Sequence, residues 1–314
     1  INRIGPGTLE KTSTLPYRVP AIPKEKMTLE QQNSEVLRLR FESGEPVKHT
    51  TRITLYAGDP RIEIDHIIQE NFHEPLYVTF DLNVELPTVW HEEVGAVIQA
   101  KLHSSGGHYA EAKARYDHLS FNHFLWMGNN DDGMILSNGD CQFFKLGESK
   151  PTLLDETSST VHALIGGMVD DKRGIYNVGG DSLFMVRFAL KPAAGFFDQT
   201  KAMRFALDHQ NPLVAGRVTG VWDAEMPDSR YRFLSTSDPD VLLWTLKPGE
   251  EGGTIIRFWN MKEAANPVFT LDRAPASVRS ATHVETVLGP VKLEGEHFTG
   301  EFRQQQMCTF RLDW

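Results

Sequence analysis

A strict alternation of residue types in LYVTFDLNVEL, residues 76–86, constrains the fold more than any other feature. Every second residue from Leu76 to Leu86 is a large apolar one, and the residues between them are Tyr, Thr, Asp, Asn and Glu. A period of two places successive side chains on opposite faces of a β-strand. The segment therefore predicts one long strand over residues 76–86, with one face on a hydrophobic core and the other in solvent.

The same pattern recurs along most of the chain, interrupted by turn residues. TRITLYAGDPRIEIDHII, residues 51–68, predicts two strands around a Gly-Asp-Pro turn. In MILSNGDCQFFKL, Asn138-Gly139 stands between two apolar runs and predicts a type I′ hairpin. VLLWTLKPGEEGGTIIRFWNM, residues 241–261, predicts a second hairpin around GEEGG. Further strands are expected in SLFMVRFAL, AGRVTGVW, NPVFTL and MCTFRLDW.

Helix signals are few by comparison. TLEQQNSEVLRLR, residues 28–40, and FDQTKAMRFALDH, residues 197–209, show some i, i+4 spacing. Many strands joined by turns, with little helix, predict an all-β protein rather than an alternating α/β fold. The expected fold is a large antiparallel β-sandwich followed by a small terminal β-sandwich.

Three regions are expected along the 314 residues, a length that exceeds the usual size of one core. Residues 1–44 are interpreted as a lead-in arm and linker, because their first part is rich in Pro and Thr. Residues 45–237 would form the large β-sandwich domain, and a polar break at 235–240 would precede a small C-terminal β domain, 238–314. The opening INRIGPG has neither an initiator Met nor a signal-peptide pattern, so the sequence is interpreted as a fragment.

Composition limits the partners and the compartment. The formal net charge of -10 disfavours nucleic acid and anionic membranes, because both require a basic surface. Cys141 and Cys308 are far apart and outside any Cys-x-x-Cys spacing, so two buried or half-buried free thiols are expected rather than a disulfide or a structural zinc site. Free thiols are compatible with a reducing compartment and slightly favour the cytoplasm.

Histidines are the first candidates for a site. HEEVG, which starts at His91, begins like the zinc motif His-Glu-x-x-His but has Gly95 at its fifth position. Four more histidines follow in a short stretch: His103, His108, His118 and His123. Facing strands would have to bring several imidazoles onto one zinc ion, so hydrogen-bonded or surface histidines are the preferred interpretation. No metal ligand is assigned.

Two other features have a functional and a structural interpretation. GNNDDG, residues 128–133, offers oxygen ligands but lacks the spacing of an EF-hand loop, so a polar turn is preferred. Tryptophans can stack on sugar rings, yet a Trp on a strand belongs more often to a core. The candidates are Trp90, Trp126, Trp222, Trp244 and Trp259. Trp244 and Trp259 are expected to pack across the hairpin of residues 241–261.

Motif-like segments follow one another in the second half of the chain. FALKP spans Phe188–Pro192, Ala206–Leu213 ends in NPL, and Val241–Asn260 carries LKP before an acidic, Gly-rich turn and IIRFWN. With TLYAGDPRIEID and FNHFLWMGNNDDGMILSNGD upstream, this order resembles the C-terminal region of family 38 glycoside hydrolases, the retaining α-mannosidases. The resemblance covers residues 45–314. Phe188 and Ala193 stand where the family often has Tyr and His.

The resemblance implies a galactose-mutarotase-like supersandwich and a supporting role. The family's zinc ligands and Asp nucleophile lie on an N-terminal domain upstream of the matched region, so no catalytic, cofactor-binding or metal-binding residue is expected in this chain. It would be the non-catalytic region of a retaining α-mannosidase, with zinc in the missing N-terminal domain. Its partners would be the catalytic and helical domains of the same protein, a mannoside bound through them, and a second copy in a homo-oligomer.

Two other functions stay open on sequence alone. A free-standing mutarotase or epimerase would need a His acid and a carboxylate base on facing strands, and the chain has 12 histidines. A sugar-binding module without chemistry would present exposed Trp faces to a glycan. Retaining glycoside hydrolysis requires two carboxylates about 5 Å apart, and isolated Asp and Glu residues in the sequence do not reveal such a pair.

Overall fold

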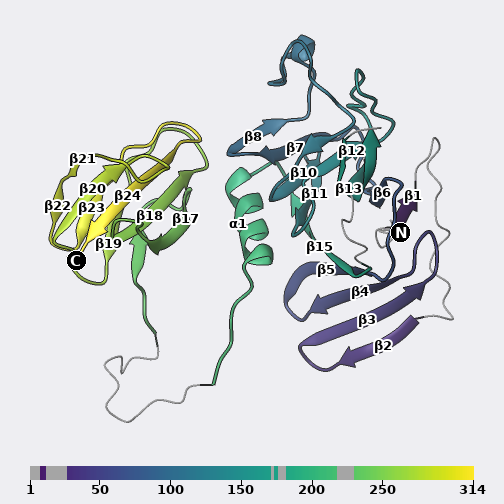
Figure 1. Cartoon of the computed structure of the whole chain (residues 1–314), viewed down its shortest axis with the longest axis horizontal. Helices are drawn as coiled ribbons and strands as arrows, with labels where there is room; N and C mark the ends of the chain where they lie inside the picture. The colour runs from purple at the N-terminus through teal and green to yellow at the C-terminus, as the bar shows by residue number, and fades with distance from the viewer. Residues whose placement is uncertain (1–7, 12–26, 171–172, 176–181, 218–229) are drawn as a thin grey trace. The chain divides into compact units, whose positions relative to one another are not determined.

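The computed structural model describes residues 8–11, 27–170, 173–175, 182–217 and 230–314. The chain divides into a large unit, Ile1–Pro212, and a small unit, Leu213–Trp314. The strands pair antiparallel in both units. Within the described residues, α1 (Gln199–Gln210) is the single α-helix (Figure 1). The predicted fold class, an all-β chain with a large and a small antiparallel sandwich, is confirmed.

The large unit contains two sheets. The larger has nine strands in the order β2-β3-β4-β5-β15-β11-β10-β7-β8. They are β2 Met27–Gln32, β3 Val36–Ser43, β4 His49–Tyr56, β5 Asp59–Ile68, β7 Thr88–Glu93, β8 Ala96–Gln99, β10 Phe124–Gly128, β11 Asp132–Asn138 and β15 Phe184–Ala194. The other has six strands, ordered β1-β6-β13-β12-β9, with β14 paired to β13. They are β1 Thr8–Lys11, β6 Leu76–Asp81, β9 Leu119–Ser120, β12 Phe143–Leu146, β13 Thr160–Asp170 and β14 Arg173–Ile175.

The core of the large unit lies between these two sheets. Phe188 and Ile64, neighbours in the nine-stranded sheet, are fully buried together with Phe80 and Phe144 of the six-stranded sheet. The rings of Phe80 and Phe188 meet edge to face with centroids 5.1 Å apart. The alternation predicted for residues 51–68 and 182–190 produces this core, because alternate side chains of β5 and β15 face it.

β6 differs from the predicted strand in length and in exposure. It ends at Asp81 rather than Leu86, and Tyr77 and Thr79 are buried instead of facing solvent. His162 of β13 accounts for part of this burial, since its Nδ1 lies 2.8 Å from Thr79 Oγ1 and its ring meets Tyr77 edge to face. Polar residues that satisfy each other can therefore fill a face that period two alone would assign to water.

The segment 28–40 is a β-hairpin and not the predicted helix. Asn33 forms the turn between β2 and β3, where its Oδ1 accepts the backbone N–H groups of Glu35 and Val36. Leu37 and Leu39 share one face of β3, a period of two that outweighs the weak helical spacing. Residues 27–43 thus belong to the nine-stranded sheet, which corrects the lead-in arm predicted for 1–44.

Asn138-Gly139 is a corner between the sheets and not the predicted type I′ hairpin. β11 belongs to the nine-stranded sheet and β12 to the six-stranded one, so the two strands do not pair. Neither residue has the positive φ that a type I′ turn requires. The side chain of Asn138 is buried and bonds to backbone groups on both sides of the corner.

The helix predicted over 197–209 is confirmed as α1. Asp198 caps its N-terminus by accepting the backbone N–H groups of Thr200 and Lys201. The helix covers the outer face of the nine-stranded sheet at β10 and β11 (Figure 1). Phe197, just before it, stacks on Trp90 with centroids 5.1 Å apart.

The tryptophans follow the structural interpretation where the structure describes them. Trp126 is buried against Phe197, and Gly128 and Gly133 leave room for its ring because a Cβ at either would meet it within 3 Å. Trp244 and Trp259 form an edge-to-face pair, as predicted. Trp222 lies outside the described residues. GNNDDG is the turn between β10 and β11.

The small unit also has two sheets. One has the order β16-β19-β23-β22 and the other β17-β18-β24-β20-β21. The strands are β16 Leu234–Thr236, β17 Val241–Pro248, β18 Thr254–Asn260, β19 Val268–Leu271, β20 Ser277–Ala281, β21 Val287–Val291, β22 Leu293–Glu294, β23 His297–Thr299 and β24 Met307–Asp313. Phenylalanines fill the core, with Phe258 stacked on Phe269 at 4.0 Å between centroids.

The hairpin predicted in residues 241–261 is confirmed as β17 and β18. Gly252 and Gly253 form the turn of this hairpin with positive φ, and a Cβ on Gly253 would meet the Leu312 carbonyl oxygen at 2.6 Å.

The domain boundary differs from the prediction at 237/238. β16 pairs with β19, so residues 234–236 belong to the small unit, and the division falls after Pro212.

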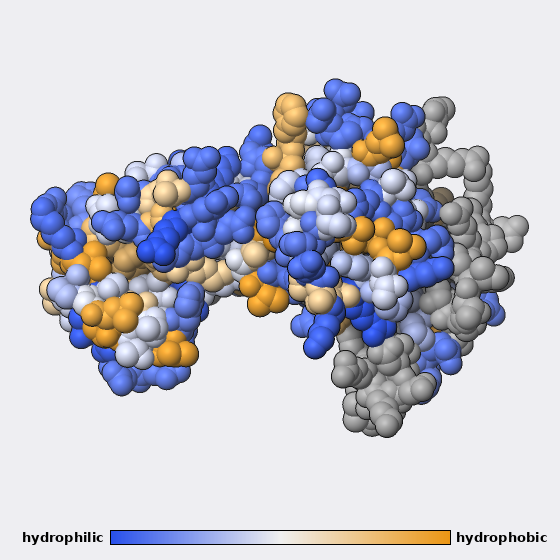
Figure 2. Space-filling view, turned by 90° about the horizontal axis from the view of Figure 1, so that it is seen from above, coloured by the Kyte–Doolittle hydropathy of each residue, from blue (hydrophilic) through white to orange (hydrophobic). Residues whose placement is uncertain are grey.

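The surface drawn in Figure 2 is mostly hydrophilic. The hydrophobic residues on that face form small separate groups. Among the residues that the structure describes, no helix has the length and hydrophobicity to cross a membrane. Cys141 is buried and Cys308 half-buried, both as free thiols, which confirms the prediction.

Candidate functional site

A cavity of about 420 Å³ opens beside the hairpin of β7 and β8 at the edge of the nine-stranded sheet. Its walls come from that hairpin and from residues 108–120, which end in β9 of the other sheet. The polar and aromatic lining residues are Glu93, His108, Tyr109, Arg115, His118 and Ser120. We call this space the edge cavity. A concave site with a few polar groups is the usual form of a small-molecule site.

A buried histidine fixes one wall of the edge cavity. His91 is fully buried, and its Nδ1 lies 2.6 Å from the carbonyl oxygen of Ser120. A carbonyl only accepts, so Nδ1 carries the proton, and Nε2 accepts from the hydroxyl of Tyr109 at 2.7 Å. Burial lowers the pKa of His91 to about 4, more than the Ser120 bond raises it. The imidazole is therefore neutral, and the hydroxyl proton of Tyr109 is used in the hydrogen bond to its Nε2.

The next residue along β7, Glu92, is a buried carboxylate with its partners inside the protein. Its side chain faces away from His91, because neighbours on a strand alternate. Oε2 of Glu92 accepts from Nδ1 of His123 at 2.8 Å, and Oε1 accepts from the backbone N–H of Gly95 at 2.9 Å. Glu92 thereby ties β7 to the segment before β10 and closes the β7–β8 turn.

Glu93 lies half-buried in the cavity wall and differs from Glu92 in its surroundings. Among the described residues, none donates a hydrogen bond to its carboxylate or forms an ion pair with it. Burial raises the pKa of Glu93, and the charge of Glu92 raises it further. The cavity therefore contains a carboxylate whose ionised form the protein itself does little to stabilise.

The opposite wall holds a cation that is already neutralised. Arg115 donates two hydrogen bonds to Asp117, from Nε to Oδ1 at 2.6 Å and from a terminal nitrogen to Oδ2 at 3.0 Å. His118 lies next to the same carboxylate, with Nδ1 3.3 Å from Oδ2. Burial raises the pKa of Asp117, but the Arg115 bond and the charge of His118 outweigh it and leave the pKa below its usual range.

The histidines that the sequence analysis singled out divide among different places. His108 and His118 line the cavity and His91 supports it, whereas His123 bonds to Glu92. His103 begins a short exposed 3-10 helix. No three His, Cys, Asp or Glu side chains converge on a possible metal position in the described part of the chain. Sequence reasoning did not single out Tyr109, which belongs to no motif, or Glu93, which stands in HEEVG at a position that the zinc motif leaves open.

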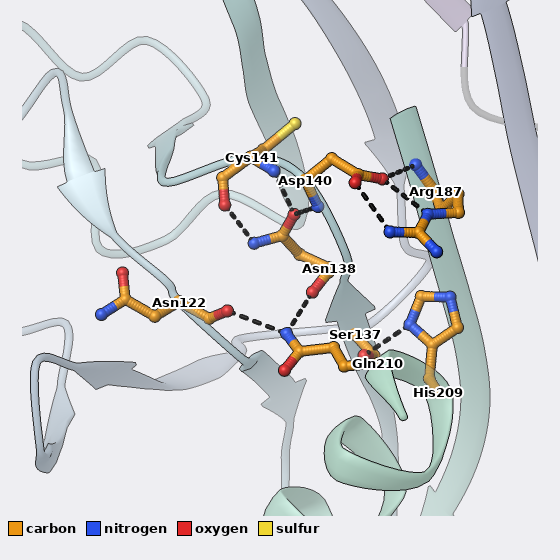
Figure 3. A network of polar contacts seen from close by, with 8 residues as sticks. All are labelled: Asn122, Ser137, Asn138, Asp140, Cys141, Arg187, His209 and Gln210. Atoms are coloured by element: carbon orange, nitrogen blue, oxygen red, sulfur yellow. Dashed lines mark hydrogen bonds and ion pairs between the residues drawn. The ribbon is translucent and has the colours of Figure 1, made fainter. Parts of the chain in front are cut away.

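A polar network behind the edge cavity holds the segment that contacts His91 and Glu92. Asn138 donates to the carbonyl of Phe121 at 2.8 Å, and its Oδ1 accepts from the backbone of Cys141 at 2.6 Å (Figure 3). Gln210, at the end of α1, donates to the carbonyls of Asn122 and Asn138. Side chains of β11 and α1 thus hold residues 120–123 in place. These hydrogen bonds thereby position Ser120 and His123.

Two further contacts in Figure 3 attach β15 and α1 to this corner. Asp140 accepts three bonds from Arg187, from its backbone N–H and from two guanidinium nitrogens, at 2.8 to 2.9 Å. Ser137 and His209 bond through Oγ and Nδ1 at 2.8 Å. Burial lowers the pKa of His209 to about 4, so this imidazole is neutral near pH 7.

We expect Tyr109→Phe to lower the free energy of unfolding by about 1.5 kcal/mol, because Nε2 of buried His91 loses the one donor that the described residues give it. Tyr116→Phe is the matched control, since Tyr116 packs edge to face on Tyr109 and no described residue bonds to its hydroxyl. Urea denaturation of both variants measures the difference. Equal losses for the two variants would contradict the Tyr109–His91 bond.

The fold and the cavity together define an all-β chain with a two-sheet sandwich, a polar site at one sheet edge, and a second small sandwich. A similar fold is found in an α-mannosidase from Enterococcus faecalis V583, with a TM-score of 0.64 and 10% identity. A protein in glycosyl hydrolase family 38 from Enterococcus faecalis also matches, with a TM-score of 0.64 and 11% identity. Both matches cover 91% of this chain, but only 35% and 36% of the solved chains.

At these identities the similarity shows the fold. This chain folds like a segment of family 38 α-mannosidases about a third of their length, which confirms the resemblance seen in the sequence at the level of fold. No family model and no curated protein matches the sequence. A putative aldose 1-epimerase from Escherichia coli K12 is similar over 61% of this chain and 81% of its own, with 8% identity and a TM-score of 0.32, which is too low to support an argument.

Proposed function

We propose that this chain is the C-terminal β-sandwich region of a retaining α-mannosidase, and that it supports catalysis performed by another part of that protein. The observation that carries the proposal is the fold match over 91% of this chain to about a third of two family 38 structures. Function is taken here from fold and motif order together, since a fold alone does not specify chemistry.

The chemistry of the edge cavity supports a non-catalytic role in glycoside hydrolysis. A retaining mechanism uses a nucleophilic carboxylate and a second, acid–base carboxylate on either side of one bond. Glu93 lines the cavity, but Glu92 is engaged by His123 and Gly95, and Asp117 by Arg115. The zinc ion of such an enzyme would lie in its N-terminal domain, as the resemblance to the family implies.

The partners follow from the same proposal. The region would pack against the catalytic and helical domains of its own protein and contribute to a homo-oligomer, and a mannoside would reach it only through the catalytic domain. Its net charge of -10 supports protein and small-molecule partners over nucleic acid.

The test compares this 314-residue chain with the complete product of its gene. We expect the complete protein to hydrolyse 4-nitrophenyl α-mannoside and to lose that activity with a zinc chelator, while this chain alone shows no turnover. Turnover by this chain that Glu93→Gln abolishes would contradict the proposal, as would a complete protein that lacks the activity. Faster mutarotation of glucose by this chain, measured by polarimetry, would favour an epimerase instead.

A further inference from the structure

The edge cavity has an uncompensated negative charge on its wall. Glu93 and Arg115 are its charged lining residues, apart from the histidines, and Arg115 is neutralised by the two bonds to Asp117. Glu93 has neither an ion pair nor a hydrogen bond from the described residues. The wall therefore repels anions and attracts a group that carries positive charge and donates hydrogen bonds.

A second group on the wall also presents an acceptor. The hydroxyl proton of Tyr109 points to His91 Nε2, an arrangement fixed by the bond between His91 Nδ1 and the Ser120 carbonyl. The lone pairs of the Tyr109 oxygen remain for a donor that enters the cavity. His108 and Ser120 add polar groups to the same wall. The site thus offers acceptors to an ammonium group and several partners to neighbouring hydroxyls.

We infer that the edge cavity binds a small hydroxylated primary amine in its ammonium form, with the ammonium on the Glu93 carboxylate. Its volume of about 420 Å³ lies in the range of small-molecule sites. An ammonium within hydrogen-bond distance supplies the cation that the described residues do not place beside Glu93, and it relieves the repulsion between Glu92 and Glu93. This inference goes beyond the mannosidase proposal and does not depend on it.

The cost of keeping an ionised Glu93 in the folded protein also supports a ligand at this carboxylate. Burial and the charge of Glu92 raise the pKa of Glu93, so the ionised form is disfavoured in the folded protein. Carboxylates kept in such surroundings are typical of functional sites, because folding alone would favour a neutral residue. Glu93→Gln should therefore raise the melting temperature of the ligand-free protein.

The experiment titrates D-glucosamine and D-glucose, which differ in an ammonium and a hydroxyl group, into the wild-type chain near neutral pH by isothermal calorimetry and NMR. We expect glucosamine to bind at least about tenfold tighter than glucose, and Glu93→Gln to abolish that difference. Glu111→Gln is the control, since Glu111 is an exposed carboxylate in the segment 108–120 that forms part of the cavity wall but does not itself line the cavity.

The inference is overturned by three results. Equal binding of the two sugars would make the cavity a site for neutral polyols, and no binding of glucosamine would exclude the ammonium group. A glucosamine affinity that Glu93→Gln leaves unchanged would place binding elsewhere. The melting temperature of Glu93→Gln separates a lost contact from misfolding, because a folded variant melts at or above the wild-type temperature.

Discussion

Asn138→Ala will lower the free energy of unfolding by about 3 kcal/mol, which is a large share of the stability of an ordinary domain. The side chain is buried and makes four bonds to the backbone, two as donor and two as acceptor. Alanine would leave the carbonyls of Phe121 and Cys141 and the N–H of Cys141 without a partner among the described residues. Each unsatisfied buried group costs about 1 kcal/mol or more.

The matched control is Asn129→Ala. Asn129 also accepts two backbone N–H groups, those of Asp131 and Asp132, but in an exposed turn where water replaces the lost bonds. We expect a loss of about 0.5 kcal/mol for this variant. Urea denaturation of both variants gives the comparison. If Asn138→Ala costs no more than Asn129→Ala, the corner between the two sheets does not depend on the network of Figure 3.

Lowering the pH from about 7 to about 5 will destabilise the protein by several kcal/mol, because two fully buried histidines must stay neutral. Burial lowers the pKa of His66 to about 3 and that of His91 to about 4. In the unfolded chain both titrate near 6.5, so below that pH the unfolded chain binds protons that the folded protein does not. Each histidine contributes about 1.4 kcal/mol per pH unit to the loss, down to its folded pKa.

Other groups change this slope in known directions. His49 and His209 add to the loss, since burial lowers the pKa of both. Burial raises the pKa of Asp65 and Glu93, so protonation of these carboxyls favours the folded state and opposes the loss. In the unfolded chain Asp and Glu titrate near 4, whereas His titrates near 6.5. The interval between about pH 6.5 and pH 5 therefore reports mainly the histidines.

The measurement is urea denaturation at several pH values in this interval. His66→Gln should reduce the slope by about 1.4 kcal/mol per pH unit, whatever its effect on stability near pH 7. A stability that does not vary between pH 7 and pH 5 would show that His66 and His91 can be protonated in the folded state.

Local patterns determined the individual strands and the class of fold. Period two predicted β4, β5, β15, β18 and β24, since in each of them alternate residues meet a core made by the neighbouring strands. The i, i+4 spacing in residues 197–209 predicted α1, and the structure adds the N-terminal cap by Asp198. Two predictions from local patterns were wrong because of tertiary contacts. β6 is covered on both faces, although one face was expected in solvent, and residues 28–40 pair as a hairpin at the edge of a sheet instead of forming a helix.

The corner at Asn138 shows what a turn rule leaves undecided. Asn-Gly between two apolar runs favours a hairpin because both residues tolerate positive φ. Here the second apolar run pairs with β13 in the other sheet, and the Asn side chain replaces the missing ladder with its own bonds. The strand that pairs with the second apolar run lies further along the chain, so the residues near Asn138 do not determine whether a hairpin or a corner forms.

An acidic all-β chain, two free thiols, a C-terminal hairpin and an order of segments like that of family 38 α-mannosidases could all be predicted from the residues alone. The division between the two units, and the cavity lined by Glu93, Tyr109 and His118, could not. Strands follow from the period of neighbouring residues, whereas a site is made by residues that the packing of two sheets brings together.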